Sequence, residues 1–178
     1  NSSTGEVLLH DVFVPEDHML PKATGLNGPL STLSSARYGI AWGSLGSAED
    51  CWLRSRDYAM ERKPFGRPLA EMQLVQSKLA VMQTDIALGL QGCLRVGRLL
   101  DEGRGTTEMI SLIKRNSCER ALNIARMARD IHAGNGLRGS YHIMHHILNL
   151  EADITYEGTH DIHSLVLGRS QTGLQAFY

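Results

Sequence analysis

One carboxylate, Glu157, stands between two segments whose patterns are typical of helices, residues 141–150 and 162–168. Gly158 follows it, and Thr159 has the hydroxyl that can cap a helix by accepting one of the free N–H groups of its first turn. We therefore expect Glu157 to lie on a sharp turn, relieved by the glycine, that could aim the carboxylate into a cleft. The alternative is a surface acid that favours a helix N-terminus through the helix dipole.

Five histidines have helical spacings that suit metal ligands, at i, i+3 and i+4 in one segment and at i and i+3 in the next. Residues 157–160 also spell one Glu-x-x-His motif, but di-iron bundles need two such copies and a glutamate from each of two further helices. The sequence has no second copy. We expect the histidines on polar helix faces and no metal site, with metal ligation as the alternative. The five are His142, His145, His146, His160 and His163.

Two further segments could bind a ligand, and the first of them suits a ligand that carries phosphate. In the segment Arg62-Lys-Pro-Phe-Gly66, the arginine can pair with a phosphate and the aromatic ring can stack on a flat group. Residues 130–136 place small residues at a helix end, where a backbone can approach a ligand closely, although a helix C-cap explains them equally well. No strand precedes that segment, so it is not a dinucleotide fingerprint. An ordinary inter-helix loop is the alternative for the first segment.

Long helices must position these residues. Apolar residues recur at helical spacing over most of the chain, and Pro64, Gly103 and Gly134 mark the breaks. Three helices of about thirty residues joined by short loops must lie antiparallel to hide their apolar stripes, so the fold class is mainly α, an up-and-down four-helix bundle with short extra helices. A short β-leaning piece, residues 154–156, interrupts the pattern. The predicted helices span residues 32–62, 71–102, 106–132, 141–149 and 161–170.

The first 28 residues have a different pattern. Val7, Leu9, Val12 and Val14 form short apolar runs that end at Pro15, and this pattern favours strands. One strand pair is only marginally stable alone. We therefore expect the last strands of a truncated β domain here, and the missing initiator Met suggests that the true N-terminus is absent.

The composition is that of an ordinary globular protein, with 178 residues, 42% hydrophobic residues and a net charge of −1. No basic stripe indicates nucleic acid, and no apolar run is long enough to span a bilayer. Cys51, Cys93 and Cys118 are odd in number and lack CxxC spacing, so we expect buried thiols in a reducing compartment.

Taken together, these motifs resemble the C-terminal half of the acyl-CoA dehydrogenase family, and most closely its glutaryl branch. The resemblance covers essentially the whole chain, in order. The motifs are Ala36-Arg-Tyr-Gly-Ile-Ala-Trp-Gly43, Arg62-x-x-Phe65-Gly66-x-Pro68-Leu69, Gln73-Leu-Val-Gln76, Gly134-Asn-Gly136, Asn149-Leu-Glu-Ala152 and Thr155-Tyr-Glu-Gly-Thr-His-Asp-Ile162.

The resemblance implies that residues 1–28 end a middle β domain and that residues 29–178 form the C-terminal helical bundle domain. It implies that Glu157 is the catalytic base, which removes a proton from the carbon next to a thioester while a hydride leaves the β carbon for a flavin. Tyr156 and Gly158 would touch the acyl group. The strip that would line the substrate is Leu30, Ser31, Thr32, Leu33, Ser34, Ser35, Ala36 and Arg37.

The implied cofactor is FAD. Arg62, Phe65 and Gln73 resemble a loop that reaches the FAD of a neighbouring subunit. The helix end along the adenosine diphosphate portion would be Asp130, Ile131, His132, Ala133 and Gly134, although the family usually has glycine where Ala133 stands. Flavin-side contacts would come from Thr159, His160 and Asp161, and Phe177 would close the site.

The implied activity is oxidative decarboxylation of glutaryl-CoA to crotonyl-CoA, in lysine and tryptophan degradation. The enzyme would be a homotetramer that passes electrons to electron-transfer flavoprotein, in the bacterial cytoplasm or the mitochondrial matrix. One alternative is a short-chain acyl-CoA dehydrogenase with another substrate. Another is a truncated helical-bundle fragment that serves assembly and has no activity alone.

Overall fold

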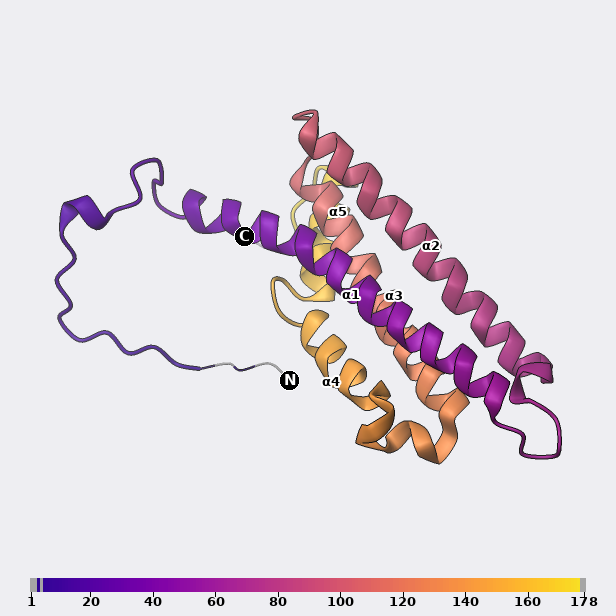
Figure 1. Cartoon of the computed structure of the whole chain (residues 1–178). Helices are drawn as coiled ribbons and strands as arrows, with labels where there is room; N and C mark the ends of the chain where they lie inside the picture. Colours follow the sequence, from indigo (N-terminus) through magenta and orange to yellow (C-terminus); the bar gives the residue numbers. More distant parts are fainter. Residues whose placement is uncertain (1–2, 4, 177–178) are drawn as a thin grey trace.

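The computed structural model describes residue 3 and residues 5–176, and all regular structure within them is helical. Figure 1 shows three long helices, α1, α2 and α3, running side by side. Consecutive long helices are antiparallel, and the shorter α4 and α5 both pack on α3. The predicted bundle is therefore confirmed. The α-helices are α1 (Asn27–Glu61), α2 (Gln73–Asp101), α3 (Thr107–His132), α4 (Ile143–Asp153) and α5 (His160–Thr172), and the 3₁₀ helices are η1 (Glu16–His18), η2 (Leu69–Glu71), η3 (Ala133–Leu137) and η4 (Gly139–Tyr141).

Local signals explain where these helices begin. The Thr106 hydroxyl accepts a hydrogen bond from the Met109 N–H at 3.3 Å and caps α3, and Thr159 caps α5 through the Ile162 N–H at 3.2 Å. Helix α1 begins earlier than predicted, because Pro29 lies within its first turn, where a missing N–H costs no hydrogen bond.

Small residues form the contact between α1 and α3. Helix α1 buries Ala48 and Ala59, and α3 buries Ala121, Ala125 and Ala128, each with no solvent exposure. Side chains without bulk let the two helix backbones approach closely, so α3 becomes the central helix that also supports α4 and α5. The three thiols are buried, as predicted.

The strands predicted in residues 1–28 are absent from the part of the chain that the structure describes. Residues 5–15 are irregular, and Val7 and Phe13 are more than 80% exposed. Figure 1 shows this segment looping away from the bundle. The prediction fails because a strand needs a partner for its N–H and C=O groups, and no other segment lies alongside. Among the described residues, none of the helices is long and apolar enough to cross a membrane.

Candidate active site

The predicted turn joins α4 to α5 and holds Glu157 in an unusual backbone conformation. Glu157 has φ +57° and Gly158 has φ +94°, both in the left-handed region. A residue with a side chain rarely adopts this conformation unless its surroundings enforce it. The sharp turn is confirmed, and its backbone geometry fixes the direction in which the Cα–Cβ bond of Glu157 leaves the chain.

The β-leaning piece predicted just before this turn is wrong. The N–H of Ile154 donates to Leu150, and the N–H groups of Thr155 and Tyr156 both donate to the Ala152 carbonyl. These bonds continue the winding of α4, because no neighbouring strand is present to pair with the segment.

A buried lysine supports the turn from below, and the sequence reasoning missed it. Lys114 on α3 is 1% exposed, and its ammonium donates to the carbonyls of Asp153 at 2.7 Å, Tyr156 at 2.9 Å and Gly158 at 2.9 Å. One signal could have found it. Lys114 lies four residues from Ile110 and four from Cys118, so it falls within the apolar stripe of its helix.

A second cation reaches the turn from α1. The Nε of Arg37 donates to the Glu157 carbonyl at 2.6 Å. Arg37 is the member of the predicted substrate strip that contacts the turn. The other residues of that strip, from Leu30 to Ala36, lie on the first turns of α1, where the Ser31, Thr32 and Ser34 hydroxyls bond to carbonyls of their own helix.

The Glu157 side chain is half-buried, and its Oε2 atom is buried without a hydrogen-bond partner among the described residues. An ionised carboxylate in this position can still accept a proton or a hydrogen bond. The carboxylate is therefore available for chemistry, whereas the backbone around it is held by Lys114 and Arg37.

His163 lies against the same turn and is 1% exposed. The prediction of a polar-face histidine is wrong here, because α5 turns this ring toward Gly158, where a Cβ would come within 2.9 Å of Nε2. Neither ring nitrogen has a hydrogen-bond partner within the described part of the chain. Burial lowers the pKa of His163, the charges of Lys114 and Arg37 lower it further, and the backbone of Glu157 raises it, so that the pKa lies at about 4. The ring is therefore neutral.

A partly buried polar network lies next to the turn. Asp153 accepts a hydrogen bond from Ser44 on α1 at 3.0 Å and another from the Tyr156 hydroxyl. Ser44 also meets the Cys118 thiol at 3.3 Å. Burial and the Asp153 carboxylate raise the pKa of Tyr156 above its usual range. This network ties α1, α3 and the end of α4 together under Glu157.

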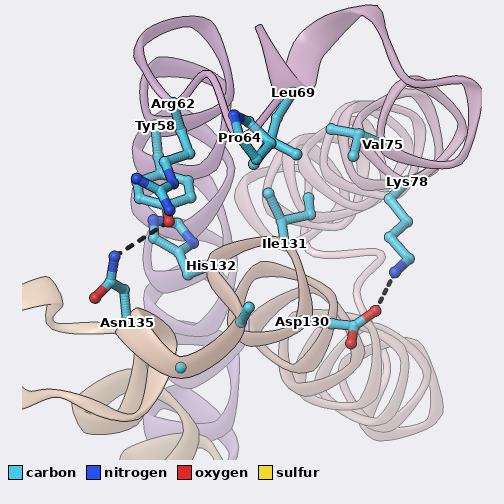
Figure 2. Close-up of a pocket in the computed structure, with 12 residues that line it drawn as sticks. Tyr58, Arg62, Pro64, Leu69, Val75, Lys78, Asp130, Ile131, His132 and Asn135 are labelled. Carbon is cyan, nitrogen blue, oxygen red and sulfur yellow. Dashed lines mark hydrogen bonds and ion pairs between the residues drawn. The ribbon is translucent and has the colours of Figure 1, made fainter. Parts of the chain in front are cut away.

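A separate cavity of about 500 Å³ lies where α1 ends and α3 ends (Figure 2). It brings Arg62 together with residues 130–134, although they are far apart in sequence. Lys78 pairs with Asp130 at its edge, and Tyr58 stacks on His132 with ring centroids 4.3 Å apart. Its lining residues are Tyr58, Arg62, Pro64, Leu69, Val75, Lys78, Asp130, Ile131, His132, Ala133, Gly134 and Asn135.

Two other residues predicted for this site do not line the cavity. Phe65 is 86% exposed, and Gln73 is an exposed residue at the start of α2. Phe177 lies outside the described residues. The Phe65 ring can therefore stack only on a ligand or on another chain segment that covers it.

The end of α3 differs from the predicted glycine cap. Ala133 itself has φ +51° and ψ −129°, whereas Gly134 and Gly136 are not in the left-handed region. Gly136 is needed for a different reason: a Cβ there would lie 2.5 Å from the Arg129 carbonyl oxygen. The positive φ thus falls on Ala133, one residue earlier than predicted. The backbone at Gly136 packs directly against that of Arg129 on α3.

The predicted flavin-side residues lie at the start of α5. Thr159 caps the helix, and Asp161 is exposed in its first turn. His160 lines a hollow of about 200 Å³ with Glu119 and Arg126. These three residues therefore follow Glu157 along the chain and do not line the larger cavity.

The two candidate sites are well separated. Lys114 and Asp130 lie sixteen residues apart on α3, which is about 24 Å along a helix that rises 1.5 Å per residue. The Glu157 turn and the Arg62 cavity are thus distinct places on one bundle.

The remaining histidines of the proposed metal alternative lie on α4 and just before it. His142 and His145 are exposed, and His146 pairs with Asp50 at 2.7 Å. No group of three or more His, Cys, Asp or Glu side chains that could hold a metal occurs among the residues that the structure describes.

A bundle of long helices with a carboxylate on the turn between its last two helices defines a known class of domain. Residues 23–172 match the sequence model described as "Acyl-CoA dehydrogenase, C-terminal domain". The chain belongs to the acyl-CoA dehydrogenase family.

Three relatives illustrate the range of this family. The probable acyl-CoA dehydrogenase YngJ of Bacillus subtilis (strain 168) is 35% identical over 94% of this chain and 44% of its own length. The short-chain-specific acyl-CoA dehydrogenase of Megasphaera elsdenii is 29% identical, again over 94% and 44%. CarC, a subunit of the caffeyl-CoA reductase–Etf complex of Acetobacterium woodii, is 27% identical over 93% and 44%. The chain thus spans less than half the length of these relatives.

Solved structures agree with the fold. Glutaryl-CoA dehydrogenase from Mycobacterium smegmatis superposes with a TM-score of 0.90 and 42% identity, over 93% of this chain and 43% of that one. A structure of a glutaryl-CoA dehydrogenase from the same organism in complex with FADH2 gives a TM-score of 0.86 and 40% identity, over 89% and 41%.

Proposed function

We propose that the chain forms part of a FAD-dependent acyl-CoA dehydrogenase in which Glu157 is the catalytic base. The observation that carries this proposal is the Glu157 carboxylate, whose Oε2 is buried and unpartnered on a turn held from both sides. A base needs a free lone pair, a fixed direction and partial exclusion of water, and Glu157 has all three.

Glu157 would take the proton from the carbon next to the thioester carbonyl. The hydrogen-bonded turn would limit the directions in which the Glu157 side chain points, and Tyr156 and Gly158 would flank the acyl group on either side. Arg37 and Lys114 bind carbonyls of the turn, so their charges lie close to the carboxylate without neutralising it by a direct ion pair. FAD, when bound, supplies the acceptor for the hydride from the β carbon.

The Arg62 cavity fits one end of such a cofactor. Its volume of about 500 Å³ is within the range of ligand pockets, and its walls combine apolar side chains with the Arg62 guanidinium. Among the described residues Arg62 has no side-chain partner, so its five donors are available to a phosphate group. Residues 130–134 close the opposite wall and would contact the adenosine diphosphate portion.

The separation of the two sites supports a multi-subunit enzyme. A cavity about 24 Å from the base along α3 is well placed to bind the FAD of a neighbouring subunit, while the Glu157 turn faces the flavin of its own. We propose a homotetramer for this reason. The Etf-complex relative supports electron-transfer flavoprotein as the partner that reoxidises the flavin.

For the substrate we propose glutaryl-CoA, with release of carbon dioxide and formation of crotonyl-CoA. The support is the 42% identity to the M. smegmatis glutaryl-CoA dehydrogenase, against 29% to the short-chain-specific relative. Turnover of the FAD-loaded protein on glutaryl-CoA and on butyryl-CoA, with carbon dioxide monitored, tests the choice. Faster turnover on butyryl-CoA without carbon dioxide would assign a short-chain enzyme instead.

Replacing the base tests the proposed mechanism. Glu157→Gln keeps the shape of the side chain but removes its basicity, so we expect kcat to fall by at least about 1,000-fold while the FAD content, measured by absorbance, is unchanged. Glu49→Gln, at an exposed glutamate of α1, is the matched control and should keep full activity. Substantial turnover by Glu157→Gln would contradict the assignment.

A further inference from the structure

Lys114 uses all three of its ammonium hydrogens on one short stretch of backbone. Its acceptors are the carbonyls of Asp153, Tyr156 and Gly158, at 2.7, 2.9 and 2.9 Å, and the side chain is 1% exposed. A surface lysine would rarely be fixed in this way, because its flexible stem loses entropy when it is ordered. The three carbonyls therefore form a specific binding site for the Lys114 ammonium.

The three carbonyls bracket Glu157. Asp153 is the last residue of α4, Tyr156 directly precedes the carboxylate residue, and Gly158 directly follows it. Arg37 binds the carbonyl of Glu157 itself, at 2.6 Å. Two cations from two different helices thus hold three successive carbonyls, which is how a residue with φ +57° can be kept in one conformation.

We propose that Lys114 is a positioning residue for the base, whose ammonium locks the backbone of the turn so that the Glu157 carboxylate points at the substrate. The proposal rests on the proposed function, because it requires Glu157 to be the base. Lys114 touches backbone oxygens only, so it acts through Glu157 and not on the substrate.

The pKa of Lys114 lies below its usual value, and the charges around the lysine act in both directions. Burial lowers the pKa of Lys114, whereas the Cys118 thiol and the Asp153 and Glu157 carboxylates raise it, and Arg37 lowers it. The Lys114 Nζ also lies 6.0 Å from the centre of the Tyr156 ring. The titratable and charged groups that face Lys114 from the elements packed on it are Arg37, Cys118, Asp153, Tyr156, Glu157 and His163.

The test compares three variants in the FAD-loaded protein. Lys114→Met removes the donors and the charge, Lys114→Gln keeps up to two donors without the charge, and Lys114→Arg keeps both. We expect Lys114→Met to lower kcat by about 100-fold, the scale of a misplacement of about 1 Å, with KM changed by less than about threefold. Lys114→Gln should lose less, and Lys114→Arg should recover most of the activity.

Two readouts separate positioning from simple stability. Exchange of the α hydrogens of butyryl-CoA in D2O reports proton removal alone, and it should slow in parallel with kcat. The deuterium isotope effect on kcat for α-deuterated butyryl-CoA should be larger in Lys114→Met, because removal of the α proton then limits the rate, and this ratio does not depend on how much of the protein is folded. A matched control is Lys22→Met, at an exposed lysine far along the N-terminal segment, which should change neither readout.

The outcomes are distinct. If the parent protein neither turns over acyl-CoA nor exchanges α hydrogens, the proposed function fails, whatever Lys114 does. If the parent is active and Lys114→Met keeps its exchange rate and isotope effect but unfolds at lower temperature, Lys114 is structural only and the inference is overturned. If neither Lys114→Met nor Lys114→Gln folds and binds FAD, the lysine serves folding and the positioning role is rejected.

Discussion

At the residue scale, the Glu157 turn concentrates buried groups whose charge depends on their neighbours. His163 is the clearest case, because its ring is buried beside two cations and has no hydrogen-bond partner in the described chain. Protonating this ring would place a third positive charge beside Lys114 and Arg37 at a position that is closed to water. The folded protein therefore accommodates only the neutral ring. Acid should lower the free energy of unfolding, because it favours the protonated ring of the unfolded chain.

This behaviour predicts a pH-dependent stability. The pKa of His163 is about 4 in the folded protein, below the value of about 6.5 in an unfolded chain. The contribution of neutral His163 to the free energy of unfolding is fully present above about pH 6.5. It is lost as the pH falls toward 4, because the unfolded chain binds the proton more readily. Between pH 7 and pH 5 we expect a loss of about 2 kcal/mol from this group.

Urea unfolding at the two pH values measures this loss. In His163→Gln the difference between pH 7 and pH 5 should shrink by about 2 kcal/mol, even if the variant is less stable at both. His145→Gln, at an exposed histidine of α4, is the control and should leave the difference as it is in the parent. An unchanged difference in His163→Gln would show that the ring is not held neutral.

The residues of the site differ in how far the sequence could predict them. Glu157 and Thr159 were predictable because a turn and a cap are local patterns, and both are confirmed in position. Arg62 and residues 130–134 were each expected to contact FAD through family motifs, but that they line one cavity was not predicted, because they are far apart in sequence. Lys114 and His163 were not found, because their role depends on which carbonyls and cations of other helices surround them. No local pattern reports that environment.

At the element scale, helix boundaries follow from caps and breaks and were predicted to within a few residues for α2, α3 and α5. The start of α1 was predicted five residues too late, because Gly28 and Pro29 are typical of turns but are also tolerated in a first turn. The predicted strands failed for a different reason. Strand formation requires a partner, and the pattern of one segment cannot supply it.

The end of α3 yields a prediction of its own. Ala133 has φ +51° and ψ −129°, a conformation that glycine adopts freely and that costs a residue with a Cβ roughly 1–3 kcal/mol. Ala133→Gly should relieve this strain, and after the entropy cost of glycine we expect a net gain of about 1 kcal/mol in the free energy of unfolding.

Thermal unfolding distinguishes this gain from the usual effect of glycine. Ala80→Gly, at an exposed position inside α2, is the matched control and should lose about 1 kcal/mol. Opposite signs for the two substitutions support a strained helix end. Equal losses would mean that the Ala133 backbone is relaxed. The variant also shows whether the methyl group hinders cofactor binding, since its FAD content can be compared with that of the parent.

At the scale of the whole molecule, the outer side of α2 carries an apolar stripe. Leu74, Val81 and Leu88 are 80%, 47% and 68% exposed and recur every seven residues. Figure 1 shows α2 along one edge of the bundle, packed on α1 and α3 but with no contact to α4 or α5. A stripe with this period suits contact with another helix, and a second copy of the chain can supply one. The stripe thus fits the proposed homotetramer.

A charge placed in this stripe should break the assembly without unfolding the subunit. Val81→Glu combined with Leu88→Glu would bury two carboxylates at a helix contact, so we expect light scattering to show a smaller native mass while circular dichroism keeps the helix content. Ala87→Glu is the control, because residue 87 is exposed and lies about 120° around α2 from Val81; it should keep the parent mass. A parent that is already monomeric, or a double variant with unchanged mass, would exclude α2 as the contact. Because Arg62 is proposed to bind the FAD of a neighbouring subunit, the dissociated variant should also lose bound flavin, which links the assembly to the chemistry at Glu157.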